Sequence, residues 1–241
     1  MLKLIGHRGL PQRSPENTLL SLGMALDAGA DAVECDVQLS AARIPYLFHD
    51  ATFDRVSSTD GLFFDKSEEQ LSAISVHEPS RFGDKYDFIE LSYLHDVCTL
   101  LEAHENAKIF IELKPESLQY HSRGAFVDAV VNAVAPVRRQ VIIISYDISM
   151  LEYAREHYQL PIGWVLEEYS SEYQAKANTL KPEFLFCEVN KLDSDSLWVG
   201  SWEWAVYDIV SSAQAKALYQ RGVAWVESWD VHTLRRGLSI G

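Results

Sequence analysis

The chain has 241 residues, of which 47% are hydrophobic and 23% are charged, and these values are ordinary for a soluble globular protein. This length allows one large domain or two small ones, with a core large enough to fold without disulfides. The formal net charge of −14 argues against a general affinity for nucleic acid, because an acidic surface repels polyanions.

Two further classes of protein are disfavoured. No segment reaches the roughly twenty apolar residues that a membrane-spanning helix needs, so no stable membrane insertion is expected. Cys35, Cys98 and Cys187 lack paired spacing, so neither disulfides nor a cysteine-bound zinc ion is expected. Residues 1–7 lack the long apolar region of a signal peptide, and we therefore expect a cytoplasmic protein. The oligomeric state is left open.

Short apolar runs alternate along the chain with longer amphipathic segments, a pattern typical of repeated strand–helix units. The expected strands are Lys3–His7, Asp31–Val37, Lys108–Leu113, Gln140–Ser145, Pro161–Leu166, Glu183–Glu188, Glu203–Asp208 and Gly222–Ser228. The expected helices are Glu16–Ala28, Ser92–Glu105, Gln119–Ala135, Ile148–His157, Ser170–Leu180 and Ser211–Arg221, with at most two turns at Asp193–Val199. This series predicts an α/β protein with a (β/α)8 TIM-barrel fold. A doubly wound open sheet fits less well, because the chain has no glycine-rich phosphate-binding turn.

The longest connection lies between the second and third strands, from Gln38 to Leu91. It starts with the apolar run Ile44-Pro45-Tyr46-Leu47-Phe48 and continues with polar and turn-forming residues. A connection this long usually has a function or is poorly ordered, and in a barrel it would lie over the carboxyl face, where catalytic groups gather. We predict one domain over residues 1–241, with an insertion at about residues 51–90 in the loop after the second strand.

Two acidic residues alternate in the second strand. Glu34 and Asp36 are two residues apart and point to one face, whereas Cys35 points to the other, toward the helices. Carboxylates inside a barrel repel each other unless a cation lies between them. The alternative, a strand face that meets solvent, is common in antiparallel sheets but fits a parallel barrel badly. The pattern therefore favours a metal site.

A similar pair ends the third strand, where Glu112 and Lys114 share a face. An ion pair between Glu112 and a helix lysine is the alternative role for this carboxylate. Because Glu34 and Asp36 are expected at the same place, we instead predict that the three carboxylates bind one metal ion. A set of carboxylates without His or Cys ligands favours a hard divalent cation, Mg²⁺ or Ca²⁺.

Two histidines end apolar segments, His7 in His7-Arg8-Gly9 and His49 in His49-Asp50. Each motif alone is compatible with a structural role. At the mouth of a barrel, however, the two imidazoles would flank a metal-bound phosphoryl group and divide the acid and base roles. The other histidines, at positions 77, 95, 104, 121, 157 and 232, are expected at the surface. Trp198, Trp202 and Trp204 are expected to pack in the core or a lid, with an aromatic wall for the substrate as the alternative.

Six motifs occur in an order that is highly specific: His7-Arg8-Gly9, Pro15-Glu16-Asn17-Thr18, Glu34-Cys35-Asp36-Val37, His49-Asp50, Thr52-Phe53-Asp54-Arg55 and Glu112-Leu113-Lys114. The chain resembles a metal-dependent glycerophosphodiester phosphodiesterase of the TIM-barrel type, strongly over Lys3–Pro115 and more weakly beyond. The resemblance implies that Glu34, Asp36 and Glu112 bind the metal, that His7 and His49 are the acid–base pair, and that Arg8 and Lys114 contact phosphate. The implied reaction splits a small glycerophosphodiester into an alcohol and sn-glycerol 3-phosphate, through attack by the glycerol 2-hydroxyl.

Two segments depart from the family pattern. Tyr207-Asp208-Ile209-Val210 stands where the family commonly has Trp-Thr-Val-Asn, and Glu227-Ser228-Trp229 where the last strand usually closes with Thr-Asp. Both lie on the half of the mouth expected to hold the leaving alcohol, so they concern substrate preference. Two other functions remain as alternatives. One is a phospholipase D-like enzyme for lysophospholipid or sphingolipid, a type that is usually secreted and disulfide-bonded. The other is a catalytically silent barrel that binds metal or phosphate.

Overall fold

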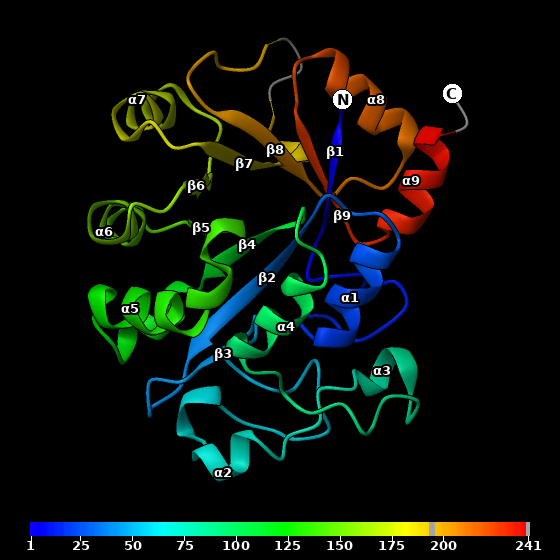
Figure 1. Cartoon of the computed structure of the whole chain (residues 1–241), viewed down its shortest axis with the longest axis vertical. Helices are drawn as coiled ribbons and strands as arrows, with labels where there is room; N and C mark the ends of the chain where they lie inside the picture. Colours follow the sequence, from blue (N-terminus) through cyan, green and yellow to red (C-terminus); the bar gives the residue numbers. More distant parts are fainter. Residues whose placement is uncertain (193–195, 240–241) are drawn as a thin grey trace.

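A computed structural model of the chain describes residues 1–192 and 196–239. Among these residues, parallel strands close into a barrel with helices on its outside (Figure 1), which confirms the predicted TIM barrel. The barrel strands are β1 (Lys3–Gly6), β2 (Ala32–Leu39), β4 (Lys108–Leu113), β5 (Val141–Ser145), β6 (Ile162–Val165), β7 (Phe184–Glu188), β8 (Glu203–Tyr207) and β9 (Trp225–Ser228). Neighbouring strands pair in the order β1-β9-β8-β7-β6-β5-β4-β2, and pairing of β1 with β2 closes the ring.

Most helices follow barrel strands and cover the barrel, and two short ones lie in the long connection after β2. They are α1 (Leu19–Asp27), α2 (Glu68–Leu71), α3 (Pro79–Phe82), α4 (Val97–Glu102), α5 (Arg123–Ala133), α6 (Ile148–Tyr158), α7 (Ser171–Leu180), α8 (Ser212–Gln220) and α9 (Val231–Ser239). Short 3₁₀ turns occur at Phe63–Asp65, Leu94–Asp96, Pro115–Gln119, Ala135–Gln140 and Val189–Lys191. Most of the longer helices begin after a Ser, Thr or Asp whose side chain accepts a hydrogen bond from the first turn, as Thr18 does for α1. No described helix is both long and apolar enough to cross a membrane.

Alternation along the strands divides the apolar residues between two layers. Ile5, Phe110 and Trp225 belong to the cluster inside the barrel. Cys35 belongs to the larger cluster between strands and helices, as the alternation in the second strand predicts. The inward face of β2 therefore carries Glu34 and Asp36 into the barrel.

The predicted insertion after the second strand is present. It starts with β3 (Pro45–Leu47), which pairs antiparallel with β2, and it contains α2 and α3 (Figure 1). Aromatic residues such as Phe48, Phe53 and Phe63 give it an apolar cluster of its own. A hydrogen bond also connects the insertion to the turn after β1: the backbone N–H of Glu16 donates to the Glu78 carboxylate at 2.6 Å.

Several helix boundaries differ from expectation. The first helix begins at Leu19 rather than Glu16, because Asn17 has a left-handed backbone (φ 52°) that no α-helix continues. The expected helices at Ser92–Glu105 and Gln119–Ala135 are each shorter and adjoin a separate 3₁₀ turn. Helix α9 was not predicted. Of the expected turn at Asp193–Val199, residues 193–195 lie outside the described residues, and residues 196–199 are not helical.

Candidate active site

Three carboxylates converge at the carboxyl ends of two adjacent strands. Glu34 and Asp36 lie on the inner face of β2, and Glu112 on β4 is the register partner of Asp36. One oxygen from each carboxylate can be chosen so that all three lie within 4.8 Å of one another. The structure therefore brings together the carboxylates that the sequence singled out.

The three carboxyl groups differ in the direction of their pKa shifts. Burial raises the pKa of Glu34 well above its usual value, and the neighbouring carboxylates Asp36, Glu227 and Glu112 add to this effect. Burial also raises the pKa of Glu112. The pKa of Asp36 is lowered despite its burial, because the Arg8 guanidinium is close by. The site therefore holds concentrated negative charge that a bound cation would stabilise.

Arg8 and Lys114 border these carboxylates. Arg8 Nε lies 2.9 Å from Asp36 Oδ2, and its backbone N–H donates to Glu34 Oε2 at 3.0 Å. Lys114 Nζ donates to Glu112 Oε1 at 2.9 Å and lies 3.5 Å from Asp36 Oδ1. Both cations are nearly buried, and these carboxylates raise the pKa of each against the effect of burial. They therefore stay charged at the edge of the site.

His49 projects toward the same carboxylates from the insertion. Its Nδ1 donates to Asp50 Oδ1 at 2.6 Å, which leaves Nε2 facing Asp36 Oδ1 at 4.0 Å. Asp50 is itself held by Arg55, whose Nε donates to Asp50 Oδ2 at 2.7 Å. The guanidinium of Arg55 also forms two hydrogen bonds with Glu16. This chain of contacts fixes the orientation of the imidazole.

His7 follows β1 on the opposite side of the site. Its Nε2 lies 3.7 Å from Glu227 Oε1 on β9, and its Nδ1 lies 3.9 Å from Asp208 Oδ1. Its ring packs edge-on against Trp229, with ring centroids 5.1 Å apart. Burial, reinforced by the nearby charge of Arg8, lowers the pKa of His7 to about 3, so the imidazole is neutral near pH 7.

These groups line a cavity of about 210 Å³ at the mouth of the barrel. Its lining residues are His7, Arg8, Glu34, His49, Glu112, Lys114, Ile144, Tyr146, Val165, Phe186, Tyr207, Asp208, Glu227 and Trp229. Its lining combines charged groups with the aromatic rings of Tyr146, Tyr207 and Trp229. Such a pocket suits a small ligand with an anionic centre.

Comparison with known proteins agrees with this geometry. Residues 7–229 match the model of the glycerophosphoryl diester phosphodiesterase family. The chain belongs to this family.

Individual relatives cover smaller parts of the chain. A glycerophosphodiester phosphodiesterase from Bacillus altitudinis is 31% identical over 120 residues, which are 50% of this chain and 48% of the relative. A mouse glycerophosphoinositol inositolphosphodiesterase is 36% identical over 87 residues, which are 36% of this chain and 16% of the relative. The chain thus spans about half, or less, of the length of these curated relatives.

Solved structures show the same barrel over nearly the whole chain. A phosphodiesterase from Oleispira antarctica, in complex with the product sn-glycerol-3-phosphate, superposes with a TM-score of 0.86 at 23% identity, covering 98% of this chain and 96% of that one. The glycerophosphodiester phosphodiesterase from Agrobacterium tumefaciens gives a TM-score of 0.78 at 20% identity, covering 98% of this chain and 100% of that one.

The donor set of this glycerophosphodiester phosphodiesterase family member fits a divalent metal ion. Glu34 Oε1 is buried and has no hydrogen-bond partner among the described residues. An acceptor oxygen left in this way is costly unless a cation or proton satisfies it. With Asp36 and Glu112, Glu34 gives an all-oxygen set of the kind that Mg²⁺ and Ca²⁺ prefer.

Sequence reasoning missed several residues of the site. Glu227 and Asp208 were noted only as departures from the family pattern, although both line the cavity. Applying the two-residue alternation to the last strand would have found Glu227, because Trp225 on the same strand belongs to the inner cluster. Asp50, Arg55 and Glu16 stood out only as members of the ordered motifs, since their contacts connect distant segments.

One expectation about the histidines was wrong, whereas the expected core packing of Trp202 and Trp204 is confirmed. His77 is buried at 7% exposure and bonds to Ser75 and Ser58, whereas it was expected at the surface. Trp202 directly precedes β8, at the amino end of the barrel, where Trp204 Nε1 donates to the Trp198 carbonyl. These tryptophans therefore pack far from the mouth and form no wall for a substrate there.

Proposed function

We propose that this chain hydrolyses small glycerophosphodiesters to an alcohol and sn-glycerol 3-phosphate in a reaction that requires Mg²⁺ or Ca²⁺. The observation that carries the proposal is that two histidines, two nearly buried cations and the carboxylates of Glu34 and Glu112 line one cavity of about 210 Å³, with Asp36 beside the two glutamates. Membership of the family supports the same reaction class. We further propose that residues 1–241 act as one domain.

Arg8 and Lys114 bind the phosphate in this scheme and stabilise the negative charge that develops on it. Their own carboxylate contacts hold them in place before substrate arrives. Glu34, Asp36 and Glu112 would hold the metal ion, which supplies charge neutralisation and lowers the pKa of a coordinated hydroxyl. Substrate with a single negative charge is favoured over bulk polyanions, because the surface is acidic overall.

His7 and His49 divide the proton transfers. The 2-hydroxyl oxygen of glycerol attacks phosphorus and gives its proton to one imidazole, while the bond from phosphorus to the alcohol oxygen breaks. The other imidazole gives a proton to that leaving oxygen. Water then opens the cyclic phosphate, which yields sn-glycerol 3-phosphate. The Asp50 contact suits His49 to this task, because it orients the ring through Nδ1–H and leaves Nε2 as the nitrogen that exchanges a proton with the substrate.

The test measures release of glycerol 3-phosphate from glycerophosphocholine and glycerophosphoethanolamine with a coupled dehydrogenase, in Mg²⁺, Ca²⁺ or chelator. We expect product only when metal is present, and none from Glu112→Ala. His49→Ala should lose activity by about 10²–10⁴-fold, while its metal affinity, measured by calorimetry, stays unchanged. Glu188→Ala, at the end of β7 and paired with Lys191, and His95→Ala, an exposed histidine, are the matched controls.

Three results would contradict the proposal. Product from lysophospholipid or sphingolipid but not from glycerophosphodiesters would indicate the phospholipase D-like alternative. Metal binding by folded protein without turnover of any of these substrates would indicate a silent binding barrel. Equal activity in Glu112→Ala and the parent would overturn the ligand assignment.

A further inference from the structure

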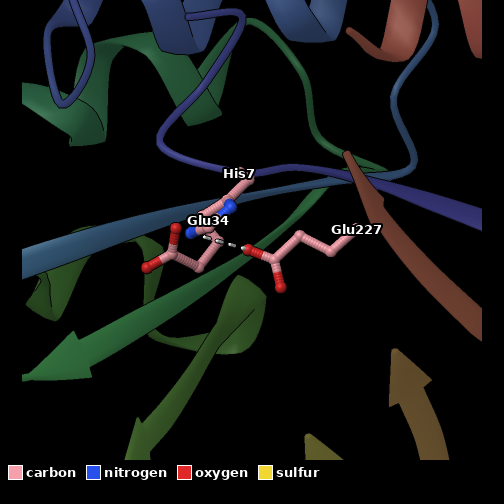
Figure 2. A group of neighbouring side chains, drawn as sticks. All are labelled: His7, Glu34 and Glu227. Atoms are coloured by element: carbon pink, nitrogen blue, oxygen red, sulfur yellow. Dashed lines mark ion pairs between the residues drawn. The ribbon is translucent and has the colours of Figure 1, made fainter. Parts of the chain in front are cut away.

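A second group of ligands lies beside the three carboxylates and overlaps them at one residue. One ligand atom each from His7, Glu34 and Glu227 can be chosen so that all three lie within 4.8 Å of one another. Figure 2 shows the His7 ring between the two carboxylates, with a nitrogen directed at Glu227. The side chains come from β9, β2 and the end of β1, which are adjacent strands of the barrel.

Two buried oxygens in this group have no hydrogen-bond partner among the described residues. They are Glu34 Oε1 and Glu227 Oε1, on residues that are each only 2% exposed. Glu227 Oε1 lies 3.7 Å from His7 Nε2, which is too long for a hydrogen bond. Two ligands of one tetrahedral ion with bonds of about 2.0–2.2 Å lie roughly 3.4 Å apart, so the spacing is close to that of a metal site.

The charge around the cavity leaves room for a further cation once a substrate is bound. Arg8, Lys114 and one divalent cation would together balance four carboxylates, those of Glu34, Asp36, Glu112 and Glu227. A phosphodiester then adds negative charge, and the one basic side chain within 4 Å of a Glu227 oxygen among the described residues is His7, which is neutral near pH 7. A further cation at Glu227 restores the balance.

The ligand types differ from those of the first site. An imidazole nitrogen with two carboxylates suits Zn²⁺ and similar transition metals, whereas an all-carboxylate set suits Mg²⁺ and Ca²⁺. Histidines that bind metals usually direct their other ring nitrogen toward a carboxylate or carbonyl. Here the carboxylate on that side is Asp208, whose Oδ1 lies 3.9 Å from His7 Nδ1, beyond hydrogen-bond distance.

We propose that His7, Glu34 and Glu227 form a second cation site that takes a transition-metal ion such as Zn²⁺. Filling it occupies the Nε2 lone pair of His7 and so withdraws this imidazole from proton transfer. Zn²⁺ then inhibits the enzyme that Mg²⁺ or Ca²⁺ activates. The binding site does not depend on the reaction, and only the inhibition rests on the proposed function.

Calorimetric titration with Zn²⁺, using folded and chelator-treated protein, tests the site directly. Glu112→Ala removes a ligand of the first site only, so it should still bind one Zn²⁺ per chain. Adding Glu227→Gln to that variant should weaken binding by at least about tenfold, as expected when a metal site loses a supporting group. Adding Glu188→Gln instead is the matched control and should leave Zn²⁺ affinity unchanged.

Inhibition provides a second measurement on the full enzyme. Turnover is measured with saturating Mg²⁺, and the rate of each protein is normalised to its own rate without Zn²⁺. The Zn²⁺ concentration that halves turnover should then be at least about tenfold higher for Glu227→Gln than for the parent. Equal Zn²⁺ affinity with and without Glu227→Gln would overturn the site, as would loss of all Zn²⁺ binding in Glu112→Ala. The titration involves no substrate, so its result stands even if the chain hydrolyses no glycerophosphodiester.

Discussion

Glu227 adds a fourth buried carboxylate to a site that already contains Glu34, Asp36 and Glu112. It sits on β9, next to Ile5 of β1, so its position is set by the strands that also place His7. Burial raises its pKa well above the usual value, and Glu112, Asp36 and Asp208 raise it further. One residue thus couples the protonation of the site to the stability of the metal-free fold.

This coupling gives a pH-dependent prediction for Glu227→Gln in chelator. The pKa of Glu227 is raised above 4.5 in the folded protein. Above that pH, Glu227 therefore keeps a proton in the folded state that it releases in the unfolded chain. Folding then becomes less favourable as the pH rises, so Glu227 lowers the free energy of unfolding. The cost grows by ~1.4 kcal/mol for each unit of pKa elevation. Urea unfolding should show the variant gaining stability over the parent progressively as the pH rises above about 4.5, with no gain near pH 4. A constant difference across this range would show that Glu227 is not the titrating group.

Residue patterns predicted the convergence of the three carboxylates better than the contacts around them. Glu34 and Asp36 were recognisable because a parallel barrel strand is normally apolar on both faces, so two charges on its inner face indicate a bound cation. The contact of Asn17 with this site was not recognisable from the sequence. Its side-chain N–H donates to the Asp36 carboxylate, and its side-chain oxygen accepts from the Asp36 backbone N–H. Its role depends on a left-handed turn that brings two segments together, and no local pattern reports such a contact.

At the scale of elements, the turn from β1 to α1 carries His7 and Arg8 into the site. Gly9 has φ of 93°, and a Cβ added to it would lie 2.4 Å from the Ser21 backbone carbon. The turn therefore packs directly on the first turn of α1, whose N-cap is Thr18. This close approach fixes where the histidine and arginine point.

Gly9→Ala should destabilise the protein more than Gly222→Ala does. Both glycines have positive φ, but a Cβ on Gly222 meets nothing within 4 Å, so that variant suffers only backbone strain, ~1–2 kcal/mol. Gly9→Ala adds a clash with the α1 backbone, for a further ~1–3 kcal/mol. Urea unfolding of both variants measures the difference. Equal losses would mean that α1 moves aside freely and does not fix the turn.

Strands were easier to predict than helices for a physical reason. Buried apolar runs mark Ile109–Ile111 in β4 and Phe184–Cys187 in β7, and the predicted limits of both strands agree with the structure to within one residue. Helix ends instead depend on caps and on the turns beside them, as at Thr18 and Asn17. Helix α9 has Val231 and Leu234 as its buried residues, too weak a signal to stand out beside the last strand.

At the scale of the whole molecule, the acidic site lies within a chain whose net charge is −14. Self-repulsion of this kind opposes compaction, and it is strongest where charges are buried together. A divalent cation held by Glu34, Asp36 and Glu112, as proposed, would relieve that repulsion locally. Monovalent salt screens only the exposed charges, so the two kinds of cation should affect stability differently.

Adding Mg²⁺ or Ca²⁺ should therefore raise Tm well beyond the effect of NaCl at equal ionic strength. At a hundred times Kd, binding to the folded state stabilises it by ~2.7 kcal/mol. For a chain of this size that free energy corresponds to a rise in Tm of roughly 5–10 °C. Glu112→Ala, which lacks one ligand, should show only the NaCl-like rise, whereas Glu188→Ala should behave like the parent. Scanning calorimetry of the three proteins makes the comparison, and equal rises in divalent and monovalent salt would mean that screening, rather than a bound ion, accounts for the stabilisation.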